Sequence, residues 1–403
     1  MIDFIPSTLA AARYPAKTRS VPIAIYSIVF AALCTSWGIL WDIMWHISIG
    51  RDGLFSAPHV LMYIGAIVTG VVSGYQILSI TFNKHHPARA VSIRFWGVFY
   101  GSLGAMFCVW GALAMLTSAP FDDWWHSAYG LDVEIISPPH ALLAVGFLML
   151  QFGCVVSVLA LQNRATDLAD KRPMSGSASF QIKQLFILSA GILLVQYYTL
   201  FYEKLIEINS HRSQYYILSG LLFPGFLMAI GRSARLNYAM TATTIAYLLV
   251  MLIPSWILQY VPATPKLGPV LNPITHYQPF HFPLLLIGPA YVLDRLFQRY
   301  GQRFSDWQLA GIAAVIFMTV FLLVQWPFGA FLHESPLARN HFFMSYSWRY
   351  SLPPDWPYRY KFDPAHQESA GRFALGLALA LLGAFGSARV GLWIGNWMRE
   401  IKR

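Results

Sequence analysis

Hydrophobic residues fill the chain in long, nearly uninterrupted runs that short polar stretches separate. A helix needs about 20 consecutive apolar residues to cross a bilayer, and windows of that length recur along the whole sequence. The pattern therefore predicts an all-α polytopic membrane protein with about ten transmembrane helices. The expected spans cover residues 21–46, 57–82, 93–118, 138–162, 182–205, 215–231, 237–259, 281–298, 308–331 and 371–397.

The composition supports a membrane protein rather than a soluble enzyme. Of the 403 residues, 56% are hydrophobic and only 11% are charged, which is too apolar for a soluble domain of this size. The net charge of +10 needs no nucleic acid as a partner, because membrane proteins concentrate Lys and Arg in their cytoplasmic loops. The N-terminal residues show no apolar core followed by a small-residue cleavage site, so we expect no removable signal peptide.

Basic residues occur in alternate loops, and this predicts the orientation of the chain in the membrane. They gather in the N-terminal arm, in the C-terminal tail and in residues 83–89, 164–172, 232–235 and 295–303. We expect these segments, and with them both termini, on the cytoplasmic side of a bacterial or archaeal cytoplasmic membrane. The remaining loops then face the extracytoplasmic side.

Two similar polar motifs interrupt the hydrophobic pattern, each at the junction of two expected spans. The first, Trp41 to His59, reads WDIMWHISIGRDGLFSAPH, and the second, Asp122 to His140, reads DDWWHSAYGLDVEIISPPH. Eight positions agree in residue type: Asp42/Asp122, Trp45/Trp125, His46/His126, Gly50/Gly130, Asp52/Asp132, Ser56/Ser137, Pro58/Pro139 and His59/His140. The first four spans are therefore expected to form a tandem repeat of two helical hairpins.

The spacing within each motif predicts how the side chains converge. Asp42 and His46 are four residues apart, so they lie on one face of a helix. Gly50 is expected to end that helix with positive φ, and Ser56 is expected to cap the returning helix with its hydroxyl. The last His is then presented in the first turn of the returning helix. Each hairpin thus directs one Asp and two His toward its own open end.

Two imidazoles and one carboxylate are a ligand set for a transition metal. The set suits copper, zinc or iron(II), and the intrinsic affinity of such ligands favours copper. The predicted ligands are Asp42, His46, His59, Asp122, His126 and His140. Asp52 and Asp132 in the turns are expected to orient these ligands through hydrogen bonds, with solvated turn residues as the alternative. The alternative for the motifs themselves is a purely structural role, in which their polar residues form hydrogen bonds and cap helices without binding a metal.

A second polar cluster follows the fifth expected span. Glu203, Glu207 and His211 recur every fourth residue, which predicts that they share one helical face near the extracytoplasmic boundary. Ionisable groups at membrane depth usually face a partner or a water-filled cavity, so these residues are candidates for additional metal ligands or a proton relay. The alternative is a helix end that emerges into the membrane interface.

The motifs divide the chain into five expected regions. These are a cytoplasmic arm (1–20), a tandem-hairpin metal-binding membrane region (21–162), further transmembrane helices (182–331), a long extracytoplasmic loop (332–370), and a final transmembrane helix with a basic tail (371–403). Both motifs are expected near the extracytoplasmic face.

The two motifs resemble the metal motifs in the C subunit of the copper membrane monooxygenases, the family of particulate methane and ammonia monooxygenases. Asp42, His46 and His59 match the spacing of the first copper motif of that subunit. Asp122, His126 and His140 resemble its second motif, in which the family has Asn at the position of Asp122. The resemblance covers about the first 160 residues. It implies one copper at each motif.

The resemblance also implies a function for the chain. We expect a membrane-embedded copper-binding oxidoreductase subunit, with monooxygenase-like O2 activation on a small apolar substrate. Expected partners are the lipid bilayer and other membrane subunits or an extracytoplasmic electron or metal donor. One alternative is a non-catalytic membrane protein that binds or transports copper or zinc. A further alternative is a b-type cytochrome that uses the four motif histidines as haem ligands.

Overall fold

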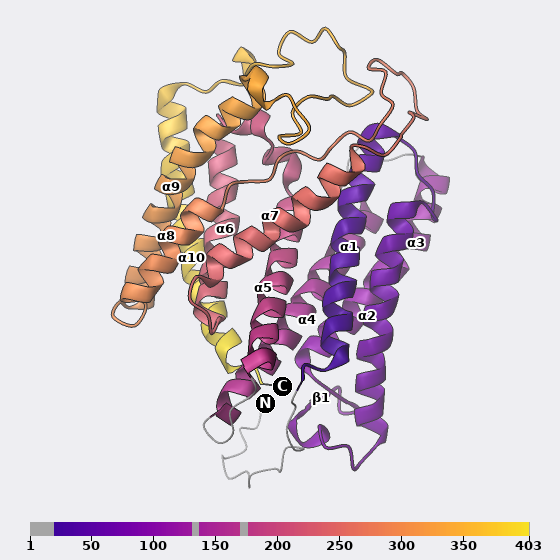
Figure 1. Cartoon of the computed structure of the whole chain (residues 1–403), viewed down its shortest axis with the longest axis vertical. Coiled ribbons are helices and arrows are strands. Elements are labelled where there is room, and N and C mark those ends of the chain that lie inside the picture. Colours follow the sequence, from indigo (N-terminus) through magenta and orange to yellow (C-terminus); the bar gives the residue numbers. More distant parts are fainter. Residues whose placement is uncertain (1–19, 131–136, 170–175, 403) are drawn as a thin grey trace.

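The computed structural model describes residues 20–130, 137–169 and 176–402, and within them the chain is a bundle of α-helices (Figure 1). The ten helices of these residues are α1 (Ile23–Ser48), α2 (Ala57–Phe82), α3 (Leu103–Tyr129), α4 (Pro138–Ala169), α5 (Gly176–Thr199), α6 (Ser213–Ser233), α7 (Ala239–Leu258), α8 (Ile287–Tyr300), α9 (Asp306–Glu334) and α10 (Ala370–Glu400). Nine of them are long and apolar enough to cross a membrane. The prediction of an all-α polytopic membrane protein is therefore confirmed.

The eighth expected span is wrong in its bounds, because residues 281–286 are not helical and the helix that forms has only 14 residues. Helix α8 begins at Ile287 instead of residue 281 and is not among the nine candidate spans. Pro283 lacks a backbone donor and disfavours helical geometry at the residue before it. Side chains satisfy the non-helical backbone that follows, since Leu284 N donates to Tyr247 Oη at 3.1 Å and Leu285 N donates to Gln325 Oε1 at 3.0 Å.

The third expected span begins too early, because residues 93–101 form a small antiparallel hairpin instead of helix. Strand β1 (Ile93–Phe95) pairs with β2 (Phe99–Gly101), and Phe95 lies opposite Phe99. The turn between the strands contains Gly97 with φ of +72°. Helix α3 starts only at Leu103, where the Ser102 side chain accepts a hydrogen bond from Ala105 N.

In both hairpins, a glycine on the returning helix lets the two helices pack closely. A Cβ at Gly65 of α2 would overlap with Thr35 and with the carbonyl oxygen of Ala31 in α1. Gly146 occupies the equivalent place in α4 and approaches Met115 and the carbonyl of Gly111 in α3. Because small residues let helix backbones approach closely in a membrane, each returning helix packs tightly on its partner. The internal repeat therefore extends from the polar motifs into the helix packing.

Helices α6 and α10 are joined by a stripe of small residues. On α10 the stripe consists of Gly376, Ala380, Ala384, Ala388, Gly391 and Gly395, all of which are buried. The tightest approach is at Gly391, where a Cβ would overlap with the backbone of Gly225. Backbone contact of this kind replaces the hydrophobic effect, which does not hold helices together in lipid.

This contact predicts the effect of one added methyl group. Gly391→Ala is expected to lower the free energy of unfolding by about 1 to 3 kcal/mol, because the rigid backbone of Gly225 cannot move aside. Gly386→Ala on the same helix is the matched control, since no atom lies within 4 Å of its Cβ position. Thermal unfolding of both variants in detergent measures the difference. Equal stability of the two would contradict the backbone contact.

The loops between the helices gather at opposite ends of the bundle (Figure 1). We call the end at which α1 ends and α2 begins the motif end. The connection between α7 and α8 and the connection between α9 and α10 also lie there, and the second of them includes the short 3-10 helices η4 (Pro336–Ala338) and η5 (Pro364–His366). The described termini lie at the other end, together with β1, β2 and the 3-10 helix η1 (Arg89–Val91).

Candidate metal centre

The hairpin of α1 and α2 presents its polar residues through a short, sharply turned connection. Helix α1 ends at Ser48, and Gly50 follows with φ of +90°, which L side chains rarely adopt. Helix α2 begins with Ser56 at the capping position and Pro58 in its first turn. The Ser56 hydroxyl makes no capping bond, so that detail of the prediction is wrong. Its position, however, is the expected one.

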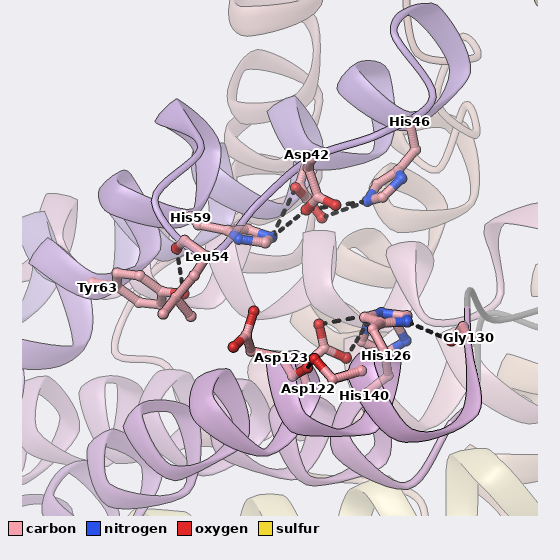
Figure 2. Close-up of polar contacts among 12 residues, drawn as sticks. Asp42, His46, Leu54, His59, Tyr63, Asp122, Asp123, His126, Gly130 and His140 are labelled. Atoms are coloured by element: carbon pink, nitrogen blue, oxygen red, sulfur yellow. Dashed lines mark hydrogen bonds and ion pairs between the residues drawn. The ribbon is translucent and has the colours of Figure 1, made fainter. Parts of the chain in front are cut away.

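Four side chains converge in this hairpin and form what we call the first metal group: Asp42, His46, Asp52 and His59. His46 Nε2 lies 3.7 Å from Asp42 Oδ2 and 3.6 Å from Asp52 Oδ2. His59 Nε2 lies 3.3 Å from Asp42 Oδ1 and 2.9 Å from Asp52 Oδ2. Each imidazole therefore faces both carboxylates. Figure 2 shows the imidazoles of His46 and His59 directed toward Asp42.

Asp52 lies closer to the site than the sequence indicated, because its carboxylate stands beside the predicted ligands rather than behind them. Burial opposes the ionisation of Asp52, but the hydrogen bond from His59 and the positive charges of His46 and His59 outweigh it. The pKa of Asp52 is consequently held below its ordinary value. A carboxylate that is ionised in this position can serve as a fourth metal ligand.

Contacts from distant loops hold the turn that carries Asp52. Within the hairpin itself, Trp45 Nε1 of α1 donates a hydrogen bond to Arg51 O of the turn at 2.9 Å. Lys266 N, from the connection between α7 and α8, donates to Ile49 O at 2.8 Å. The hydroxyl of Tyr350, from the connection between α9 and α10, fills the place that a Cβ on residue 50 would take. The turn is thus clamped between two loops.

Gly50→Ala is expected to weaken metal binding by the first metal group by about tenfold or more, because the strained backbone and the clash with Tyr350 displace Asp52. Gly53→Ala is the matched control in the same turn, since no atom of the described residues lies within 4 Å of its Cβ position and its φ is outside the left-handed region. Competition of each variant with a chelator of known affinity measures the change. A Gly50→Ala protein that binds as tightly as the Gly53→Ala protein would refute this role of the clamp.

The hairpin of α3 and α4 repeats the arrangement with Asp122, His126 and His140, which we call the second metal group. His126 Nε2 lies 3.5 Å from Asp122 Oδ2, and His140 Nε2 lies 3.4 Å from Asp122 Oδ1. Gly130, with φ of +87°, ends α3 and accepts a hydrogen bond from His126 Nδ1 at 3.0 Å. This bond fixes the proton on Nδ1 and leaves the lone pair of Nε2 directed toward Asp122. Asp132 lies outside the described residues.

The two metal groups face each other across the gap between the hairpins (Figure 2). Tyr63 lies one helical turn after His59, with the two ring centres 6.2 Å apart. Its hydroxyl donates to Leu54 O at 2.9 Å and lies within electrostatic reach of Asp42, of Asp122 and of Asp123. Tyr63 and Asp123 are not among the residues that the sequence motifs predict. The spacing of four residues between His59 and Tyr63 is the signal that could have found the tyrosine.

The cluster after the fifth span does not share a helical face, so this prediction is wrong. Helix α5 ends at Thr199, and the chain continues in two short 3-10 helices, η2 (Tyr202–Lys204) and η3 (Glu207–Asn209). Glu203 is exposed. The ring of His211 is stacked on the rings of Trp326 and Phe362, with distances between ring centres of 3.8 and 4.0 Å. None of the three predicted residues belongs to a group of metal-ligating atoms among the described residues.

Glu207 instead forms a largely buried pair with His281, which precedes α8. His281 Nδ1 donates to both carboxylate oxygens at 3.0 Å, and 12% of the Glu207 side chain is exposed. Burial opposes ionisation of Glu207, but the charge and the hydrogen bond of His281 outweigh it and hold the pKa of Glu207 below its ordinary value of 4.5. The pair ties the loop after α5 to the segment before α8.

This pair predicts how stability depends on pH. A carboxyl group whose pKa is lowered by folding stabilises the protein above its ordinary pKa, and this stabilisation is lost as the pH falls through the lower pKa of the folded state. Glu207→Gln is expected to lower the free energy of unfolding by about 1 to 3 kcal/mol at neutral pH and to flatten its decline below pH 4.5. Thermal unfolding across this pH range tests it, with the exposed Glu203→Gln as control. If the stability of Glu207→Gln declined below pH 4.5 as steeply as that of the wild type, Glu207 would not be the group responsible.

The geometry of both metal groups fits a bound transition metal. Ligand atoms about 2.0 to 2.2 Å from one metal ion lie roughly 3 to 4 Å from each other. The separations between imidazole nitrogens and carboxylate oxygens in the two groups, 2.9 to 3.7 Å, fall in or close to this range. In the second metal group, Asp122, His126 and His140 offer ligand atoms that all lie within 4.8 Å of one another, as predicted. In the first, the three residues that meet this condition are Asp42, His46 and Asp52, so Asp52 takes the place that the sequence predicts for His59. Both hairpins can therefore hold a metal ion with small adjustments of the side chains.

The chain was also compared with models of protein families, with curated proteins and with solved structures. No family model, no curated protein and no solved structure matches it. The residues of the two hairpins therefore carry the functional argument alone, and what they identify is a pair of candidate metal sites in an integral membrane protein.

Proposed function

We propose that the two metal groups bind two neighbouring transition-metal ions, with copper as the native metal, and that the chain is a membrane-embedded copper-binding oxidoreductase subunit. The observation that carries the proposal is that an Asp in contact with two His recurs, with similar separations, on two consecutive hairpins that face each other (Figure 2). One polar cluster can be a structural clasp. Two clusters with the same residues and nearly the same separations support a shared task in metal binding.

The ligand types support copper over the other candidate metals without excluding zinc or iron. Sites built from imidazole and carboxylate bind divalent copper more tightly than the other first-row divalent ions. The similarity of both motifs to the copper motifs of the monooxygenase C subunit supports the same metal. Asp42, His46, Asp52 and His59 would hold one ion, and Asp122, His126 and His140 would hold the other.

The proposed reaction class is monooxygenase-like oxidation of a small apolar substrate. Copper, when bound, supplies the one-electron redox chemistry through which dioxygen is activated. The chain orients the ligands, through the bond from His126 to the Gly130 carbonyl and through the clamped turn that carries Asp52. Tyr63 and Asp123 border the gap between the groups, and the exposed Asp123 carboxylate can exchange protons with water there.

The orientation that we propose places both metal groups near the extracytoplasmic face. Basic residues follow α2, α6 and α8 at the end opposite the motif end, and the positive-inside rule assigns that end to the cytoplasm. The outward side chains of α2 beyond the first metal group, Val60, Ile64 and Ile67, are exposed and apolar. They give a small apolar substrate a lateral approach from the bilayer. A membrane quinol or a partner subunit would deliver electrons.

A second function, the transfer of metal without catalysis, is favoured by the exposure of the first metal group. The His46 side chain is 47% exposed, so an external metal donor can reach it directly. A haem site fits less well. Its macrocycle would lie between the two imidazoles of a hairpin, where Asp42 stands within 3.7 Å of His46 and within 3.3 Å of His59.

Oxygen uptake separates the two functions. The full-length protein in lipid nanodiscs is loaded with copper, supplied with a reduced quinol and followed with an oxygen electrode. We expect copper-dependent oxygen uptake that is lost in the His59→Ala/His140→Ala double variant. The metal-free protein measures the background oxidation of the quinol. No uptake above that background, combined with rapid transfer of copper to a competing chelator, would replace the oxidoreductase with the metal-transfer function.

A further inference from the structure

A cavity of about 320 Å³ lies at the motif end, outside the two metal groups. One wall comes from residues 259–278, which follow α7, and the other from residues 341–359, in the connection between α9 and α10. Its volume lies within the range of sites that bind small molecules. None of the proposed metal ligands lines it. The cavity therefore needs an explanation of its own.

The lining of the cavity has basic side chains but no acidic ones among the described residues. The basic side chains are those of Arg359, His276 and His341. The guanidinium of Arg359 has only neutral partners among the described residues: Nη1 donates to Pro354 O at 3.1 Å and to Asn272 Oδ1 at 3.5 Å, and the guanidinium carbon lies 5.3 Å from the centre of the Trp348 ring. A half-buried guanidinium without a carboxylate partner is the group that proteins use to bind oxyanions.

Buried amide side chains make the cavity a preformed feature of the fold. Gln259 is 3% exposed, accepts a hydrogen bond from His341 Nδ1 at 3.1 Å and donates to His341 O at 2.9 Å. Asn272 is 7% exposed and donates to the carbonyls of Arg349 and Leu352. Each amide thus joins the two walls across the sequence. Arg359 contacts one of these amides, since its Nη1 donates to Asn272 Oδ1.

We propose that this cavity binds a small oxyanion, a carboxylate or a phosphate, that enters from the motif end. Arg359 supplies the charge, and the hydroxyl of Ser347 and the imidazoles of His276 and His341 supply further hydrogen-bonding groups at the lining. The site is connected to the first metal group through its wall. Gln278 N donates to Ser48 Oγ at 2.8 Å, and Tyr277 packs against Trp45, which precedes the metal group's His46.

Calorimetric titration of the full-length protein tests the proposal. The protein is first freed of metal, because anions that bind to a metal ion would otherwise give a binding signal of their own. Succinate is the probe in one arm and inorganic phosphate in the other. We expect saturable binding of at least one anion, weakened by about 10- to 100-fold in Arg359→Gln and less in Arg359→Lys. Arg372→Gln, an exposed position at the start of α10 outside the cavity, is the matched control and should bind as the wild type does.

A second variant keeps the test decisive if Arg359→Gln does not fold. Thr275 is exposed and lines the cavity, so Thr275→Glu places a negative charge in it without removing a buried contact. Anion binding should be lost in this variant while the thermal unfolding midpoint stays at the wild-type value. Binding of succinate alone assigns a carboxylate site, and binding of phosphate alone assigns a phosphate site. The absence of saturable binding by both anions, or unchanged affinity in Thr275→Glu or in folded Arg359→Gln, would overturn the proposal.

Discussion

Replacing His59 with alanine is expected to remove the metal of the first metal group and to leave that of the second in place. His59 Nε2 lies 3.3 Å from Asp42 and 2.9 Å from Asp52, so its loss removes one of the two imidazoles that face both carboxylates. Loss of a direct ligand should exceed the 10- to 100-fold reduction in affinity that is typical for loss of an orienting partner. Metal content by mass spectrometry after dialysis measures the effect. His126→Ala should produce the reciprocal loss.

His85→Ala is the control for both variants. His85 is exposed in the loop after α2, at the end of the bundle opposite the motifs, so its loss should change neither site. Complete loss of both metals from His59→Ala, in a protein with an unchanged unfolding midpoint, would contradict two separable sites.

Replacing Asp52 with alanine is expected to lower the affinity of the first metal group by at least about tenfold. The variant removes a carboxylate whose Oδ2 lies 2.9 Å from His59 Nε2 and 3.6 Å from His46 Nε2. It also removes one negative charge that would balance the positive charge of the metal ion. Chelator competition, carried out with the second group disabled by His126→Ala, isolates the effect.

Asp123→Ala tests whether charge alone explains such a result. Asp123 also faces the gap between the hairpins, but it belongs to neither metal group (Figure 2). Its loss should affect the first site much less than the loss of Asp52. Equal effects of the two variants would show that Asp52 acts at a distance and not as a ligand.

Local spacing explains why the convergence of the hairpin side chains could be predicted from the sequence. Asp42 and His46 share a helix face because they are four residues apart, and Gly50 ends the helix through its own positive φ. These properties belong to a few consecutive residues. The place of Asp52 depends instead on Tyr350 and Lys266, which are remote in the chain. No local pattern could reveal it.

Tertiary contacts also explain the errors in the fold prediction. The spacing of Glu203, Glu207 and His211 fits a helix, but the pair between Glu207 and His281 and the stacking of His211 on Trp326 hold the chain in short turns. In residues 281–286 hydropathy predicts a helix, whereas the backbone there is not helical and side chains of neighbouring helices accept hydrogen bonds from it. Hydropathy measures the preference for the membrane, and it does not determine the backbone geometry within it.

Copper stoichiometry combined with electron paramagnetic resonance is the decisive test of metal binding by the two hairpins. The protein is purified in detergent from copper-replete cells, as wild type and as the His59→Ala/His126→Ala double variant. We expect two copper ions per wild-type chain, with a Cu(II) signal that shows coupling to nitrogen, and neither copper nor signal in the double variant. A wild-type protein without transition metal, or a double variant that retains its full copper content, would contradict metal binding by the two hairpins.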